Sequence, residues 1–244
     1  MRKFVIIAQP RTGTSMLVNA LNTLSDFDVY GELFVRVQGM YGIEHPQEVQ
    51  DQMIKRFIRY SYDLSGKKNV EDFLNGIYHK HRLNVGFKLL APHLKRDEGQ
   101  DIINYIQSKD IYKILLYREN KLKQVISART NKQEDKVHIE SPTFVMTRVK
   151  YLIREQKELE KTFANGKFIK KSYESLTSER DVKRLDMNWL WDFFGYKWSN
   201  TCKAKLDVPL RKYRPSSIKD NVSNFGTLAS HIKNKEPQFL KWIT

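Results

Sequence analysis

Hydrophobic positions along this chain fall into short continuous runs and longer stretches with helical spacing. Four runs are apolar or β-rich and short enough to be strands: 3–8, 84–90, 111–117 and 167–171. Apolar residues spaced three or four positions apart predict helices over 14–24, 46–60, 70–79, 99–108, 122–130, 143–163 and 182–194. Strands that alternate with helices predict an α/β fold, a three-layer sandwich with helices on both faces of a central parallel sheet.

Length and composition fit one folded domain. The chain has 244 residues, of which 40% are hydrophobic and 12% aromatic, enough for a sizeable core. We therefore predict a single domain over 1–244. No apolar segment approaches the ~20 residues of a membrane span. Cys202 is the only cysteine, so no intramolecular disulfide can form and a cytoplasmic location is expected.

The charge of the chain changes this picture, because the formal net charge is +15. Such an excess points either to a polyanionic or phosphorylated ligand or to a solvated Lys/Arg surface, and both interpretations stay open. The basic residues are spread along the whole chain, with no basic tail, RGG tract or zinc-finger spacing. We therefore expect no nucleic-acid partner.

The first predicted strand is followed by a short polar segment, PRTGTS, before the first predicted helix begins. A helix N-terminus presents unpaired N–H groups and a partial positive charge, and a glycine lets the backbone approach an anion closely. Arg11 adds a fixed charge, and the hydroxyls of Thr12, Thr14 and Ser15 add donors. This segment predicts a phosphate-binding loop, and the alternative is an ordinary turn with Thr14 or Ser15 as the helix cap.

This loop differs from the nucleoside-triphosphate P-loop, GxxxxGK[ST]. The first glycine is absent, Thr14 stands at the lysine position, and the cation Arg11 precedes Gly13. No predicted strand ends in an acidic residue that could hold magnesium. We therefore expect a phosphate bound without a metal. A P-loop-type nucleotide kinase and a noncatalytic basic nucleic-acid-binding protein are the alternatives to be tested.

The sequence PRTGTSML resembles the 5′-phosphosulfate loop of the sulfotransferase superfamily, whose P-loop-like fold binds 3′-phosphoadenosine 5′-phosphosulfate (PAPS). These enzymes transfer the sulfuryl group of PAPS to an acceptor hydroxyl or amine. Arg118 at the end of the third predicted strand, with Ser127 nine residues later, is similar to the 3′-phosphate segment of the family. Tyr173 in the turn YESL stands where the family contacts the adenine.

A segment near the C-terminus, LRKYRPSSIKDN, is similar to a closing segment of the bacterial and carbohydrate branches. The resemblance therefore implies these nucleotide-binding residues: Arg11, Thr12, Gly13, Thr14, Ser15, Met16, Arg118, Ser127, Tyr173 and Lys212, with Arg211 and Arg214 as alternatives to Lys212.

The resemblance also implies a catalytic group. Lys88 stands where animal cytosolic sulfotransferases carry a lysine, but Leu90 occupies the position of their histidine base. Other branches use a glutamate after the first helix, and the segment FDVYGELF supplies Glu32. An apolar setting is expected to raise the pKa of this carboxyl into the working range of a general base. His93 is the alternative base, and a brace for Arg11 is the alternative role of Glu32.

Together these observations predict a PAPS-dependent sulfotransferase with Glu32, Arg11 and Lys88 as catalytic residues, and without a metal. The expected acceptor is a small molecule or glycan, a carbohydrate or glycolipid. Segments 35–83 and 131–141 match nothing in the family, and we predict that they are insertions that shape the acceptor side, because loops carry specificity on such scaffolds.

Overall fold

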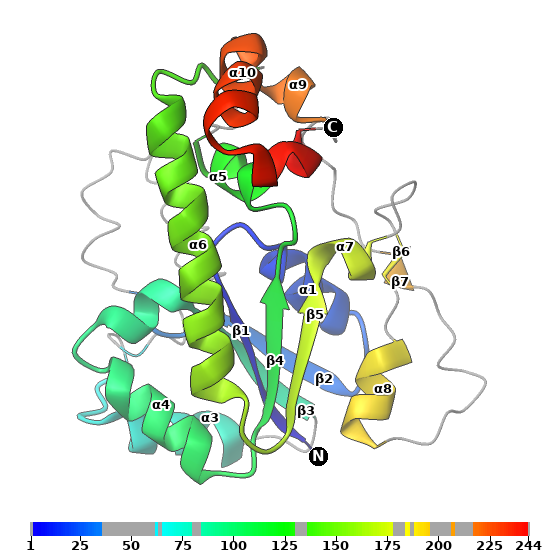
Figure 1. The fold of residues 1–244 in the computed structure, drawn as a ribbon. Coiled ribbons are helices and arrows are strands. Elements are labelled where there is room, and N and C mark those ends of the chain that lie inside the picture. The colour runs from blue at the N-terminus through cyan, green and yellow to red at the C-terminus, as the bar shows by residue number, and fades with distance from the viewer. Residues whose placement is uncertain are drawn as a thin grey trace, which may run out of the picture.

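The computed structural model describes residues 2–35, 62, 65–79, 84–129, 136–177, 184–185, 188–195, 206–207 and 217–243. Its centre is a five-stranded sheet with the order β2-β3-β1-β4-β5 (Figure 1). The strands are β1 (Lys3–Ala8), β2 (Phe27–Glu32), β3 (Asn84–Leu90), β4 (Tyr112–Tyr117) and β5 (Phe168–Ser172). All four pairings are parallel, which confirms the predicted fold class.

Helices fill the connections between the strands. The α-helices are α1 (Thr14–Leu21), α3 (Val70–His79), α4 (Gly99–Ser108), α5 (Lys121–Arg129), α6 (Pro142–Phe163), α7 (Tyr173–Leu176), α8 (Asn188–Phe194), α9 (Ile218–Asn221) and α10 (Phe225–Lys235). The 3₁₀ helices are η3 (Ala91–Lys95) and η5 (Pro237–Trp242). A small antiparallel pair joins β6 (Arg184–Leu185) to β7 (Leu206–Asp207).

The three layers follow from the alternation of side chains along the central strand β1. Phe4 and Ile6 pack into one core, which α1 and α8 cover. Val5 and Ile7 pack into the core on the other face, which α3, α4 and the C-terminal end of α6 cover. Both faces of β1 are buried, so its sequence is a continuous apolar run.

A third core lies beyond the carboxyl ends of β1 and β4, where α5 and the first half of α6 meet the C-terminal helices (Figure 1). Leu122 on α5, Val149 on α6 and Leu228 on α10 are buried there. The N–H of Val137 donates to the carbonyl of Asn221 at 2.8 Å, so part of the predicted 131–141 insertion packs against the C-terminal segment. This core holds α5 over the edge of the sheet where ligands bind in such folds.

Two local predictions are corrected. β2 was not predicted as a strand, because it is a half-exposed edge strand interrupted by Asp28 and Gly31, with a register shift near its end. It ends at Glu32, so the expectation that no strand ends in an acidic residue is wrong. The predicted helix 182–194 is also too long: residues 184–185 form β6, and α8 begins at Asn188.

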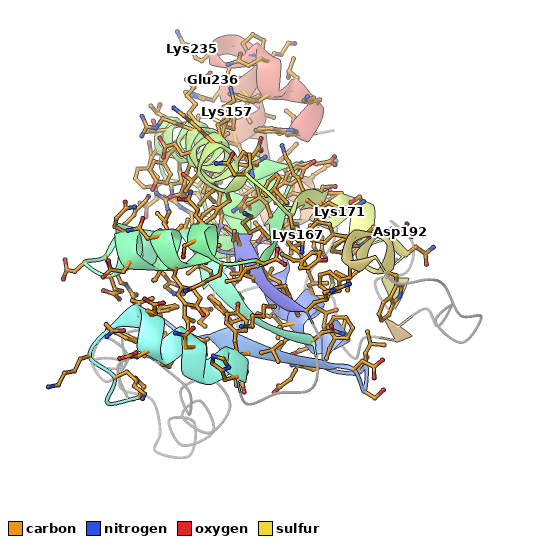
Figure 2. All side chains as sticks on the ribbon, turned by 90° about the horizontal axis from the view of Figure 1, so that it is seen from below. Lys157, Lys167, Lys171, Asp192, Lys235 and Glu236 are labelled. Atoms are coloured by element: carbon orange, nitrogen blue, oxygen red, sulfur yellow. The ribbon has the colours of Figure 1, made fainter. Side chains whose placement is uncertain are left out.

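Several predictions fall outside the described residues: the helix 46–60, most of the insertion 35–83, and the closing-segment cations Arg211, Lys212 and Arg214. Within the described part, no helix is long and apolar enough to cross a membrane. Exposed lysines such as Lys157 on α6 and Lys167 before β5 contribute to the positive surface (Figure 2).

Candidate active site

The loop after β1 carries two residues in the left-handed backbone region, Arg11 with φ 67° and Gly13 with φ 85°. For a residue with a side chain this conformation costs about 1–2 kcal/mol. The guanidinium of Arg11 offsets that cost, because its Nε and Nη2 donate to the carbonyl of Ser127 at 3.1 and 2.8 Å. The predicted phosphate loop is therefore tied to the last turn of α5 through Ser127, the residue that the family resemblance assigns to the 3′-phosphate.

Tyr173 closes one side of this loop. A Cβ added to Gly13 would lie 2.4 Å from Cδ2 of the Tyr173 ring, so only a glycine allows the ring to pack there. The other side of the loop begins α1, where Gly13 is the cap and no side chain caps the helix. The alternative in which Thr14 or Ser15 caps the helix is therefore not what forms, and the first N–H groups of α1 are left for a ligand.

The side chains of two loop residues, Thr12 and Met16, cannot bind a phosphate as the sequence suggested. The hydroxyl of Thr12 donates to the carbonyl of Gln9 at 2.8 Å, and the side chain is fully buried. A contact between Thr12 and a phosphate must therefore come from its backbone N–H. Met16 is packed in the core between the sheet and α1, so its side chain also faces away from the loop.

Arg118 follows β4, and its guanidinium lies over the same Tyr173 ring, 5.3 Å from the ring centre. Its Nε is buried and, among the described residues, has no hydrogen-bond partner. The nearest carboxylate oxygen, Oε1 of Glu174, lies 3.8 Å away, while Oε2 of Glu174 accepts from the N–H of Glu119 at 2.9 Å. Glu174 thus links α7 to the turn after β4, and Arg118 keeps an unused donor.

Burial lowers the pKa of Arg118, and the nearby charge of Arg11 lowers it further, although Glu174 and Tyr173 oppose the shift. Two guanidinium groups therefore lie on the same side of the sheet and disfavour each other. An anion bound between or beside them would relieve this repulsion and occupy the free donor of Arg118.

A second cluster lies at the carboxyl ends of β2 and β3. Nζ of Lys88 is 2.7 Å from Oε1 of Glu32 and 3.4 Å from Oγ of Ser15. Nε2 of His93 is 3.4 Å from Oε2 of Glu32. Lys88 therefore connects the predicted base to the predicted phosphate loop, and His93, which the sequence offered as a rival base, instead contacts Glu32.

The pKa expected for Glu32 is wrong in direction. Burial by itself raises the pKa of this carboxyl, but hydrogen bonds and charges from His93 and Lys88 outweigh burial and lower it to about 2. The apolar neighbours in the sequence gave no sign of these partners, which come from β3 and η3. Because a cationic or N–H donor group faces each carboxylate oxygen, Glu32 is arranged as an ion-paired group rather than a magnesium ligand. Among the residues described, no three His, Cys, Asp or Glu side chains gather as they would around a metal.

One buried network beside the loop was missed by sequence reasoning. Lys121, Gln9 and Gln124 are each at least 97% buried and hydrogen-bonded to one another. A lysine near the start of a polar helix reads as a solvated residue, so no sequence signal identifies this group.

No family model and no curated protein matches this sequence. Solved structures that are similar to it include two sulfotransferases. Mouse sulfotransferase SULT7A1 complexed with PAP is 9% identical, with a TM-score of 0.48, over 99% of this chain and 87% of that chain. Sulfotransferase STF9 from Mycobacterium avium is 10% identical, with a TM-score of 0.41, over 98% of this chain and 76% of that chain. Both of these structures are of sulfotransferases.

Proposed function

We propose that this protein transfers the sulfuryl group of PAPS to an acceptor hydroxyl, on a carbohydrate or glycolipid. The observation that carries the proposal is that one ring, Tyr173, contacts both predicted anion positions. The ring packs against Gly13 of the loop and lies under the guanidinium of Arg118, whose Nε donor is unused. PAPS carries anionic groups at both its 5′ and 3′ ends, which matches this pair.

Different residues would bind different parts of the nucleotide. The N–H groups at the start of α1, with the hydroxyl of Ser15 and the ammonium of Lys88, would hold the 5′-phosphosulfate. Arg118 and Ser127 would hold the 3′-phosphate, since a guanidinium can chelate a phosphate through two N–H groups. Tyr173 would contact the adenine. The resemblance also assigns Lys212 a role in closing the site.

When bound, PAPS supplies the sulfuryl group and leaves as 3′,5′-ADP. Glu32 is ionised at neutral pH, so its carboxylate can accept the proton of the acceptor hydroxyl, and a nucleotide that draws Lys88 away from it would raise its low pKa toward the range of an effective base. Lys88 lies within reach of both Glu32 and Ser15, and its charge can stabilise negative charge that develops between the loop and the base. Arg11 fixes the loop through Ser127 rather than through Glu32, so the alternative of Glu32 as a brace for Arg11 has no support.

His93 serves Glu32 in this proposal and does not act as the base. Its Nδ1 accepts the N–H of Leu90 at 3.2 Å, which leaves the proton of the neutral ring on Nε2. That Nε2–H points to Glu32, and the side chain is only 3% exposed. With one ring nitrogen occupied by the backbone and the other by Glu32, His93 has no free lone pair for an acceptor.

Calorimetry with 3′,5′-ADP and with ATP–Mg²⁺, followed by a transfer assay from PAPS to a panel of sugars and glycolipids, tests the proposal. We expect metal-independent binding of 3′,5′-ADP and transfer to at least one hydroxyl acceptor. Tight binding of ATP–Mg²⁺ with no response to 3′,5′-ADP would instead favour the kinase alternative.

A further inference from the structure

The ammonium group of Lys121 is buried at the first residue of α5, where the side chain is only 3% exposed. Its Nζ donates to Oε1 of Gln9 at 3.0 Å and lies 3.4 Å from Oε1 of Gln124. The ring of Tyr117 lies on another side, with its centre 5.9 Å from Nζ. A buried lysine costs folding free energy unless its charge is well solvated by polar groups, so this arrangement needs a reason.

Both glutamines connect Lys121 to the predicted phosphate loop. Gln9 is the residue between β1 and the loop, and its Nε2 donates to the carbonyl of Leu152 at 2.8 Å and to Oε2 of Glu155 at 3.0 Å. Nε2 of Gln124 donates to the carbonyl of Pro10 at 2.8 Å, one residue before Arg11. Every polar atom of the two amides therefore has a partner, and the orientation of each amide is fixed by Lys121.

We infer that Lys121 is a positioning residue for the 5′-phosphosulfate loop, which it holds through Gln9 and Gln124 without contacting the nucleotide. The inference rests on the proposed function. α5 then contacts the loop at two places. Side chains of its first turn hydrogen-bond to Gln9 and Pro10, and near its last turn the carbonyl of Ser127 accepts from Arg11. Arg118 makes none of these contacts, whereas Ser127, the other residue assigned to the 3′-phosphate, shares one of them through its carbonyl.

The charge of Lys121 also predicts that nucleotide binding is coupled to the uptake of a proton. The groups that face it are Glu174 on α7, Lys170 on β5, and Glu160 and Glu155 on α6. Burial is the largest influence and lowers the pKa of Lys121 to about 8, so at pH 8 about half of the molecules carry the proton. A dianionic 5′-phosphate bound in the adjoining loop favours the charged form. Binding at this pH should therefore draw a proton from solution.

The first test compares two mononucleotides in calorimetry, with folding of each variant checked by circular dichroism. Lys121→Met should weaken binding of 5′-AMP roughly tenfold, because the loop loses its fixed geometry. It should change binding of 3′-AMP by less than about twofold, since 3′-AMP relies on Arg118. Lys157→Met, which removes an exposed lysine of α6, is the matched control and should change neither affinity. Equal losses for the two nucleotides, or no loss of 5′-AMP binding, would overturn the inference.

The second test uses the unmodified protein and so does not depend on how the variant folds. The heat of binding 5′-AMP at pH 8 is measured in buffers of different ionisation enthalpy. At pH 8 the phosphate of 5′-AMP is already a dianion, because its second pKa is about 6, so the expected uptake of a fraction of a proton on binding reports a group of the protein. Binding without proton uptake at pH 8 contradicts the coupling of the Lys121 charge to the loop. If the unmodified protein binds neither nucleotide, the proposed function itself fails, whereas binding of both without uptake and without the Lys121→Met split removes only the role of Lys121.

Discussion

The ring of Tyr173 lies against Gly13 so closely that a Cβ on residue 13 would be 2.4 Å from ring carbon Cδ2. This contact joins the loop after β1 to the turn after β5, two segments that are far apart in the sequence. The same ring lies beneath the guanidinium of Arg118. One aromatic side chain therefore sets the distance between the two predicted anion positions.

Gly13→Ala should weaken 3′,5′-ADP binding and lower the free energy of unfolding by more than about 1 kcal/mol, since the methyl group both meets Tyr173 and disfavours a φ of 85°. The matched control is Gly76→Ala in α3, where an added Cβ meets nothing within 4 Å. That control should raise the free energy of unfolding by about 0.5–1 kcal/mol, because alanine favours the helix. Calorimetry measures the affinity, and thermal unfolding measures the stability. Equal changes in the two variants would show that the Tyr173 ring moves aside at little cost in free energy.

Arg118→Ala should weaken 3′,5′-ADP binding by about 1.5–3 kcal/mol, the worth of charge-assisted hydrogen bonds. Binding of 5′-AMP should change far less, because that nucleotide lacks the 3′-phosphate. Arg129→Ala, which removes an exposed arginine that lies over the ring of Phe144, serves as the control and should leave both affinities unchanged. Competition binding with the two nucleotides measures the difference, and equal losses would contradict the assignment of Arg118.

Glu32→Gln should lower turnover with a hydroxyl acceptor by roughly 10²–10⁴, the usual contribution of a general base. Binding of 3′,5′-ADP should stay intact or become tighter, because the ammonium of Lys88 loses its carboxylate partner at 2.7 Å and is freer to face the nucleotide. A phenol with a low pKa should lose less rate than a sugar if it fits the acceptor site. Normal turnover of the variant with sugars would place the base elsewhere.

Two substitutions at His93 separate its two contacts. His93→Asn keeps an acceptor near the N–H of Leu90 but removes the group that donates to Glu32, and His93→Gln does the reverse. If His93 orients Glu32, the asparagine variant should lose turnover more than the glutamine variant, with little change in 3′,5′-ADP affinity. A collapse of nucleotide binding in either variant would argue for a structural role alone.

The same contact predicts how stability depends on acid. The pKa of Glu32 is about 2 in the folded protein, below its usual value of 4.5, so its ion pairs contribute fully above pH 4.5. That contribution is lost as pH falls from 4.5 toward 2. His93→Asn removes one of the two groups that lower this pKa, so the folded-state pKa should move back toward 4.5. The loss of stability should still begin near pH 4.5, but it should be smaller and should level off at a higher pH than in the unmodified protein. Thermal unfolding across pH 2–6 measures the shift; superimposable curves would mean that His93 contributes nothing to the ionisation of Glu32.

The sequence by itself determined the parallel sheet and the place of the loop after β1. Buried parallel strands need continuous apolar runs, so β1, β3 and β4 appear directly in the pattern of residues. A glycine next to small hydroxyl residues before a helix is typical of an anion-binding loop and also of an ordinary capped turn, so the segment 10–15 was recognisable as a candidate. The edge strand β2 was not predicted, because only two of its six residues are buried and no long apolar run marks it.

Only the tertiary structure decided the electrostatics of the site. The residues near Glu32 in the sequence are apolar and suggested a raised pKa, yet Lys88 and His93 from another strand and its following turn lower it. In the same way Lys121 reads as a solvated helix residue but is buried against Gln9. A pKa, a buried hydrogen bond and the packing of Tyr173 on Gly13 depend on distances between atoms far apart in the chain, and a local pattern of residues carries no information about those distances.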